Sequence, residues 1–300
     1  MTKRILKRLR LQGSWVREGR AVSRVATLTL ASALVPALVP ASAMTLTPTP
    51  THARSQEGAT TPGGGARLAP AAQEITGDWI LQRVDENLAS ETKVSRSRMI
   101  IEGRGGTRTV ESQSWIRGTT ESFTEYLAPP RDRGTKMLKL GDQLWTYFPD
   151  TDRTILIAGH MLRQSVMGSD LSYEDLMEDP HLFDMYSAEI LREESLEGRP
   201  CWVLRLEALE GSSPAYYARE MWVDKERFVP LKEHRFARSG RLLKTTEVVR
   251  VERQDDRWVA REMVFKDVLK TGSGTRFILD SIDFDAEIPS HLLTRAALRR

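Results

Sequence analysis

The 300-residue sequence is poor in the residues that carry most catalytic chemistry. It contains one cysteine, Cys201, so no disulfide can form within the chain. Its five histidines include no pair at the i, i+4 spacing of a helical metal site. No Gly-x-Ser-x-Gly motif is present, and the glycine-rich stretches 103–106 and 272–274 open no expected helix, which disfavours phosphate binding. We therefore predict no catalytic residue, no metal site and no cofactor.

Two further features of the sequence, Cys201 and the acidic stretch 170–179, are weak candidates for site chemistry. Cys201 follows Pro200 at an expected strand start, with no neighbour that would lower the pKa of its thiol, so an inert buried thiol is favoured over a nucleophile. The acidic stretch 170–179 lacks the alternating ligands and central glycine of a calcium loop. A solvated helix face is the favoured interpretation of these acids.

The sequence also lacks an apolar run long enough to span a bilayer as a helix. The apolar segment 25–39 is shorter than the roughly 20 residues required, and Pro36 interrupts it. It follows a basic segment and precedes Ala41-Ser42-Ala43, the small-residue pattern of a signal peptidase site. We expect a secretory signal over residues 1–43, cleaved after Ala43, which places the mature protein in the periplasm. A retained N-terminal anchor is the alternative.

Acidic residues slightly outnumber basic ones once this leader is set aside. The whole chain has a formal net charge of +3, but residues 1–43 hold eight basic residues and one acid. The remainder has 36 basic and 40 acidic residues, so the basic balance belongs to the leader and gives no support for nucleic-acid binding. Residues 44–74, rich in Thr, Pro, Ala and Gly, predict a disordered linker before a folded domain at 75–300.

Residue periodicity in the folded part predicts one helix followed by many strands. Ile80, Val84 and Leu88 repeat at helical spacing. Alternating segments separated by turn residues then predict about ten or eleven antiparallel strands in one long meander. The expected strands are 99–102, 109–117, 122–127, 144–148, 185–195, 201–207, 219–224, 229–238, 242–253, 258–268 and 275–284. Ser239-Gly240 fits a two-residue hairpin turn.

Residues 159–183 interrupt this strand pattern. Ser172 and Asp175 have the spacing of a capping box, which predicts a short amphipathic helix at that point. Because a sheet of this length curls, both helices are expected on its concave face. The predicted fold class is mainly β: a long antiparallel sheet curled into a half-open barrel with a helical lid and an apolar cavity beneath it.

Aromatic residues are concentrated on the expected strands. Trp145 and Tyr147, for example, are two residues apart and share a face. Each could simply fill a core, but together they exceed what one thin helical cover can bury. Such unfilled apolar surface is typical of a ligand or partner site.

Three motifs resemble the outer-membrane lipoprotein-sorting protein family related to LolA. They are Gly134-Thr135-Lys136-Met137-Leu138 with Leu144-Trp145-Thr146-Tyr147-Phe148-Pro149, Met167-Gly168-Ser169-Asp170-Leu171-Ser172-Tyr173-Glu174-Asp175-Leu176, and Met221-Trp222-Val223-Asp224 with Pro230-Leu231-Lys232. The likeness covers roughly residues 75–290. It implies a half-barrel that holds an acyl chain beneath helices, and it brings no catalytic residues.

The resemblance implies a periplasmic carrier that moves an acylated lipoprotein or another lipid between the inner and outer membranes. An inner-membrane exporter of ABC or RND type and an outer-membrane acceptor are the implied partners, with transient membrane contact. The candidate cavity-lining residues are Trp115, Phe123, Leu127, Met137, Trp145, Tyr147, Leu171, Tyr173, Leu176, Trp222, Leu231 and Phe236. Two alternatives remain: an accessory subunit of an RND-type exporter with little cargo affinity of its own, and a hydrolase acting on envelope lipids.

Overall fold

The computed structural model describes residues 74–103, 106–178 and 180–300. The expected signal segment 1–43 and nearly all of the expected linker 44–74 lie outside the described residues. Within the described part, no helix is long and apolar enough to cross a membrane.

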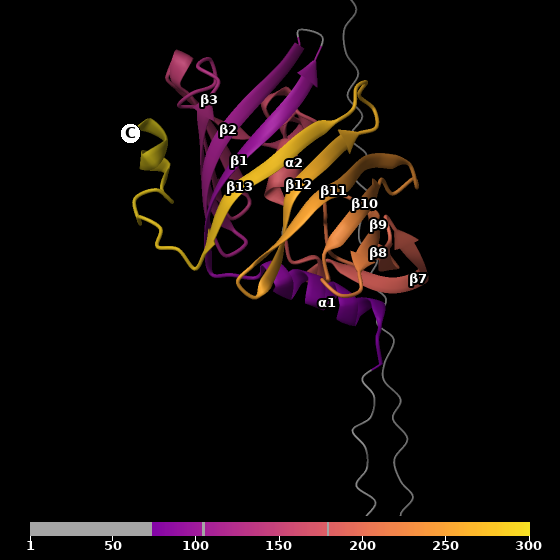
Figure 1. The fold of residues 1–300 in the computed structure, drawn as a ribbon. Coiled ribbons are helices and arrows are strands. Elements are labelled where there is room, and N and C mark those ends of the chain that lie inside the picture. The colour runs from indigo at the N-terminus through magenta and orange to yellow at the C-terminus, as the bar shows by residue number, and fades with distance from the viewer. Residues whose placement is uncertain (1–73, 104–105, 179) are drawn as a thin grey trace, which may run out of the picture. The chain divides into compact units, whose positions relative to one another are not determined.

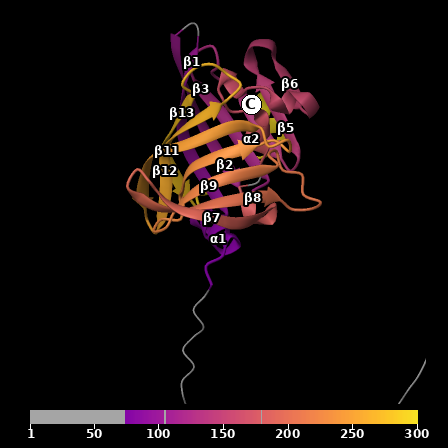
Figure 2. The same cartoon turned by 90° about the vertical axis from the view of Figure 1, so that its right-hand side faces the viewer.

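Thirteen antiparallel strands form one sheet in the described part of the chain (Figure 1). They are β1 (Thr92–Gly103), β2 (Gly106–Arg117), β3 (Glu121–Ala128), β4 (Lys136–Leu140), β5 (Gln143–Phe148), β6 (Arg153–Ile157), β7 (Tyr186–Leu196), β8 (Arg199–Ala208), β9 (Ala218–Asp224), β10 (Pro230–Phe236), β11 (Leu242–Gln254), β12 (Arg257–Asp267) and β13 (Thr275–Phe284). The sheet is curled but open, because its outermost strands β6 and β7 do not pair with each other (Figure 2). The predicted mainly β, half-open architecture is confirmed.

The strand order differs from the single meander expected from the sequence. Strands β1 to β6 form one meander and β7 to β13 form a second, and the sheet is continuous because β1 pairs with β13. The break at 159–183 therefore separates the two edges of the sheet, and thirteen strands replace the expected ten or eleven. The predicted two-residue turn at Ser239-Gly240 is also wrong. Ala237 and Arg241 close the hairpin by a 2.9 Å backbone hydrogen bond, which leaves three residues in the loop.

Helix α1 (Gly77–Leu88) confirms the predicted first element. The Thr76 side chain caps it by accepting a hydrogen bond from the Trp79 amide at 3.1 Å. Ile80, Leu81 and Val84 are buried against the inner face of β7, β8 and β9. In Figure 1, α1 crosses the lower end of the curled sheet.

Helix α2 (Tyr173–Met177) confirms the predicted capping box. Ser172 accepts a hydrogen bond from the Asp175 amide, and the Asp175 carboxylate accepts one from the Ser172 amide at 2.6 Å. The helix and the 3-10 turns before it cover the inner face of β1 to β6. Their buried residues Val166, Leu171 and Tyr173 pack with Met99, Ile101, Val110, Tyr126, Met137, Leu144 and Ile157.

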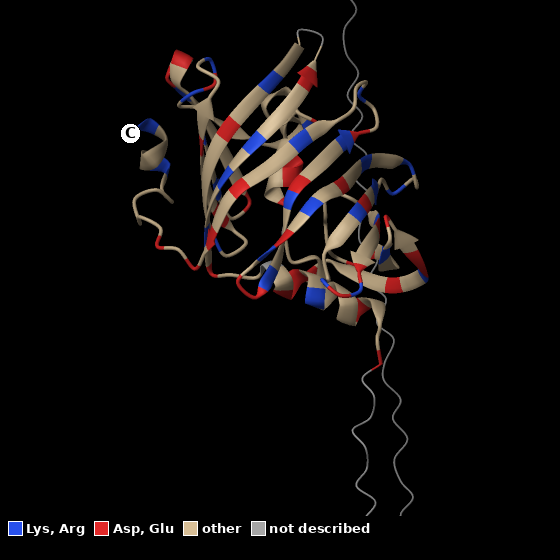
Figure 3. Ribbon diagram, viewed as in Figure 1, with Lys and Arg blue, Asp and Glu red and all other residues tan. Residues whose placement is uncertain are grey.

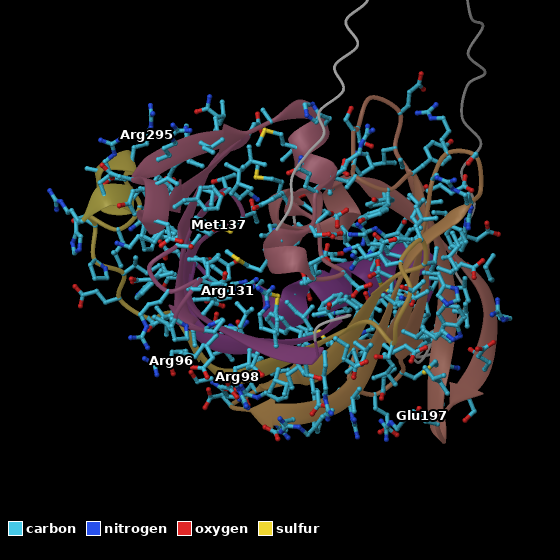
Figure 4. All side chains as sticks on the ribbon, turned by 90° about the horizontal axis from the view of Figure 1, so that it is seen from above. Arg96, Arg98, Arg131, Met137, Glu197 and Arg295 are labelled. Carbon is cyan, nitrogen blue, oxygen red and sulfur yellow. The ribbon has the colours of Figure 1, made fainter. Side chains whose placement is uncertain are left out.

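Alternation along each strand separates the inner face of the sheet from its outer face. Figure 4 shows Met137 on the inner side and Arg96 and Arg98 on the outer side of the sheet. The C-terminal segment after β13 covers part of the outer face, where Ile288, Leu293 and Leu298 are buried against β3, β4 and β5. The outer face of that region is therefore closed by the chain itself.

Candidate functional site

A cavity of about 390 Å³ lies on the inner face of the sheet between α1 and α2. Its lining side chains come from α1, from β1, from α2 and the segment after it, from strands β9 to β12 and from the turn between β9 and β10. They are Val84, Asp85, Asn87, Lys93, Asp175, Glu178, Pro180, His181, Leu182, Arg219, Met221, Phe228, Val229, Pro230, Lys232, Glu233, Arg235, Thr246, Val248, Trp258, Ala260, Met263 and Phe265. The predicted space between helices and sheet is therefore present.

One wall of this cavity is apolar. Neighbouring strands bring together Met221 of β9, Val248 of β11 and Met263 of β12, while α1 contributes Val84. Val248 pairs with Met263 across the β11–β12 ladder, so the two side chains lie side by side on one face. An apolar wall of this kind can hold a hydrocarbon chain, because burying each methylene contributes about 0.8 kcal/mol.

Beside this apolar surface, on the same face of the sheet, a row of three cations crosses adjacent strands, and two of them, Arg219 and Arg235, line the cavity. The strand register pairs Arg219 of β9 with Arg235 of β10, and Arg235 with Lys244 of β11. Only 2% of the Arg219 side chain is exposed, and 11% of each of the other two. Glu233, on the same strand as Arg235, accepts hydrogen bonds from Arg219 at 2.5 Å and from Arg235 at 2.8 Å. The row is therefore buried and partly neutralised from within the sheet.

Two carboxylates at α2 complete the neutralisation of this cation row. Glu178 pairs with Arg219, while Asp175 pairs with Lys244 and, at 3.3 Å, with Arg235. The Asp175 side chain is 4% exposed and that of Glu178 is 10% exposed. Three cations thus face three carboxylates: Glu233 from the sheet, Asp175 from α2 and Glu178 from the residue after α2.

The charged forms of these groups are favoured by their neighbours. Burial alone would raise the pKa of Glu233, but Arg235 and Arg219 lower it to about 2. Burial likewise opposes ionisation of Asp175, and Lys244 and Arg235 more than compensate, so its pKa is lowered. Burial raises the pKa of Tyr216, whose neutral hydroxyl donates a 2.5 Å hydrogen bond to Asp175. Glu233 and Asp175 are therefore ionised at neutral pH.

A second cavity, of about 670 Å³, lies on the opposite side of α2. Ser172 and Glu174 line this second cavity, whereas Asp175 and Glu178 line the first. Lys244, which does not line the first cavity, borders the second together with Arg238 and Arg241. Helix α2 and its ion pairs thus lie between the two hollows, and the second is bordered mainly by the segment between β8 and β9 and by the β10–β11 turn.

None of the twelve candidate residues from the sequence lines the 390 Å³ cavity. Met137, Leu171 and Tyr173 are buried together beneath α2 in the inner cluster. Trp115, Phe123, Trp145 and Tyr147 pack on the outer face against the C-terminal segment. Trp222 and Leu231 pack with Cys201, and Phe236 lies beside His234, a neighbour of Trp222. Leu127 is half-buried, and Leu176 is 38% exposed.

The residues that sequence analysis missed are the cation row and the apolar side chains of β11 and β12. Strand alternation identifies which residues share a face, but not which face becomes concave. The family-like motif at 167–176 did contain one useful signal, since Asp175 belongs to it and reaches the cavity.

The candidates for catalytic chemistry have ordinary surroundings. Cys201 is fully buried, and burial raises the pKa of its thiol. In residues 74–103, 106–178 and 180–300, no three His, Cys, Asp or Glu side chains are grouped so that they could hold a metal ion.

Solved structures with this fold come from several bacteria. A DUF1329 family protein from Desulfovibrio piger has a TM-score of 0.68 and 24% identity over 74% of this chain and 97% of its own. A putative outer membrane lipoprotein-sorting protein domain from Vibrio parahaemolyticus has a TM-score of 0.64 and 22% identity over 75% of this chain and 98% of its own. A LolA superfamily protein from Nitrosomonas europaea has a TM-score of 0.63 and 21% identity over 75% of this chain and 100% of its own. These similarities concern the fold, and they confirm the LolA-like resemblance.

The open sheet with helices on its inner face thus defines a LolA-like half-barrel. A family model described as "-like: Uncharacterized protein" matches residues 118–300, and the chain belongs to that family. No curated protein matches the sequence.

Proposed function

We propose that this protein is a non-enzymatic periplasmic carrier that holds an acylated lipoprotein or another lipid in the cavity between α1, α2 and the sheet. The observation that carries the proposal is the 390 Å³ hollow with an apolar wall on the inner face of a LolA-like half-barrel. Transfer from an inner-membrane exporter to an outer-membrane acceptor is the corresponding route.

The architecture supports release as well as binding. A chain of about 14 methylenes gains on the order of 11 kcal/mol on leaving water, so a carrier must enclose it and still let it go. Helix α2 has five residues, too few for stability on its own, and depends on its contacts with the sheet. Its displacement would open the cavity without unfolding the strands.

Acyl-probe uptake tests the proposal. Protein purified from a periplasmic fraction is examined by native mass spectrometry for co-purifying lipid and is titrated with acylated probes. Ala260→Trp, which fills the cavity, should reduce uptake at least tenfold. The matched control is Val249→Trp on the adjacent strand β11, where the wild-type side chain is 57% exposed. Empty wild-type protein that takes up no probe, or equal uptake by both variants, would contradict the carrier function.

One observation favours docking to an exporter as a second candidate function. Strand β6 is an edge of the described sheet, and Ile155 and Leu156 on it are 37% and 44% exposed. Exposed apolar edge strands are suited to pairing with a partner strand. Pull-down of an RND-type exporter without bound lipid, lost in Ile155→Lys, would support this role over the carrier role.

A further inference from the structure

The cation row on β9, β10 and β11 has more positive charge than the sheet itself can balance. Arg219, Arg235 and Lys244 lie side by side in register. Among the ion pairs of the described residues, Glu233 is the one partner of this row that belongs to the sheet. The two other negative partners, Asp175 and Glu178, belong to α2 and the residue after it. Without α2 and Glu178, the three cations would have Glu233 as their one negative partner among the ion pairs of the described residues.

Uncompensated charge that stays buried is costly, so α2 leaves this row more readily when another anion replaces its carboxylates. An anion that brings negative oxygens to the same place supplies that replacement, whereas a neutral ligand does not. Guanidinium groups such as those of Arg219 and Arg235 suit phosphate and carboxylate oxygens in particular. The α2 carboxylates therefore occupy positions that fit the head group of an anionic ligand.

The surroundings of the row extend this argument to the rest of the ligand. On one side lies the 390 Å³ cavity with its apolar wall, which fits a hydrocarbon tail. On the other side lies the 670 Å³ cavity, bordered by Arg163, Arg238 and Arg241. Figure 3 shows the acidic colouring of α2 on the inner side of the sheet. A ligand with a hydrocarbon tail and an anionic head group would place the tail in the 390 Å³ cavity and the head group at the cation row, facing the 670 Å³ cavity.

We propose that Arg219, Arg235 and Lys244 form the head-group site for an anionic amphiphile, and that Asp175 and Glu178 occupy this site when it is empty of ligand. The inference rests on the proposed carrier function and names the chemical class of its cargo. Binding replaces the α2 carboxylates by the phosphate or carboxylate of the ligand. Displacement of α2 then joins the two cavities beneath it.

Three probes that share parts test the proposal by calorimetric titration at submicellar concentration. Hexadecyl phosphate has tail and head, hexadecan-1-ol has the tail, and inorganic phosphate has the head. We expect hexadecyl phosphate to bind at least tenfold more tightly than hexadecan-1-ol. A tenfold difference in affinity is what one hydrogen bond between the phosphate and a cation of the row would supply. Inorganic phosphate should bind at least a hundredfold more weakly than hexadecyl phosphate.

Two substitutions should change the affinity for hexadecyl phosphate in opposite directions. Glu178→Gln removes a competing carboxylate and should raise affinity about threefold to tenfold, while Lys244→Gln removes a cation and should lower it similarly. Neither should alter hexadecan-1-ol binding more than twofold. Glu86→Gln, on the α1 carboxylate that pairs with Arg83, is the control and should change neither affinity.

The outcomes separate this proposal from the carrier function. Equal binding of hexadecyl phosphate and hexadecan-1-ol in wild-type protein, which needs no variant, overturns the anionic class and leaves the carrier. Inorganic phosphate binding as tightly as hexadecyl phosphate overturns the amphiphile and indicates a site for free anions. Failure of both tailed probes to bind overturns the carrier and the head-group site together.

Discussion

Replacing Arg219 by methionine should destabilise the fold more than any surface charge substitution. The Arg219 side chain is 2% exposed and pairs with both Glu178 and Glu233. Its guanidinium also lies 5.0 Å from the ring centre of Tyr186 and 5.6 Å from that of Tyr216. Arg219→Met leaves the Glu178 carboxylate largely buried with its partner gone. Breaking a buried pair in this way costs about 3–5 kcal/mol.

Urea unfolding at pH 7, followed by tryptophan fluorescence and circular dichroism, measures this loss. Thermal unfolding is a second measurement: each kcal/mol of lost unfolding free energy lowers the Tm of a domain of this size by about 2–4 °C. Arg219→Met should therefore melt roughly 6–20 °C below wild type. The double variant Arg219→Met with Glu178→Met should recover part of the loss, because the orphaned charge is removed as well.

The matched control is Arg98→Met on the outer face. Arg98 forms a bidentate pair with Asp280 at 2.7–3.1 Å, but the two side chains are 41% and 36% exposed. Such surface pairs contribute about 0–1 kcal/mol. If Arg219→Met costs no more than Arg98→Met, or if the double variant is less stable than Arg219→Met alone, the described burial and pairing of Arg219 are wrong.

Four further predictions follow from local geometry. The pKa of Glu233 is lowered from 4.5 to about 2, so its stabilisation, at most about 3 kcal/mol, is complete above pH 4.5 and is lost as pH falls towards 2. Urea titrations at pH 7, 4.5 and 3 should show this fall, and Glu233→Gln should show a smaller one, which remains because the pKa of Asp175 is lowered too. Gly77→Ala should lower the Tm despite the higher helix propensity of alanine, because its Cβ would lie 2.2 Å from the Ala188 carbonyl oxygen. Ser172→Ala should cost about 1 kcal/mol in urea unfolding by removing the cap of α2. Cys201 should resist alkylation by iodoacetamide in native protein and react in urea, as intact mass would report.

Most strands were predictable because alternation and turn residues are local signals. The two strands that the sequence analysis missed are β4 and β6. In β4 the consecutive residues Met137, Leu138 and Lys139 are all buried, so the strand shows no polar alternation. Strand β6 has five residues at the edge of the sheet and exposes Ile155 and Leu156. Neither has the half-buried pattern by which a strand is recognised.

The pairing of β1 with β13 could not be read from local signals. Lys93 of β1 is aligned with Phe284, almost two hundred residues later, and no turn connects the two strands. The same limit applies to the site. Arg219, Arg235 and Lys244 are scattered in the sequence, and strand register alone places them in a row. The aromatic residues Trp115, Phe123, Trp145 and Tyr147 pack against the C-terminal segment, and no local signal indicates that this segment covers the outer face.

The charged contact beneath α2 is more informative about function than about stability. A buried ion network adds little to stability compared with apolar residues of the same volume, so packing alone gives no reason for placing three cations there. An apolar contact between α2 and the sheet would be loosened by any hydrocarbon. An ionic contact is exchanged without a large loss only for a ligand that carries negative charge. The arrangement therefore couples opening of the cavity to the charge of the head group. It favours binding of a hydrocarbon tail with an anionic head group over binding of a neutral tail.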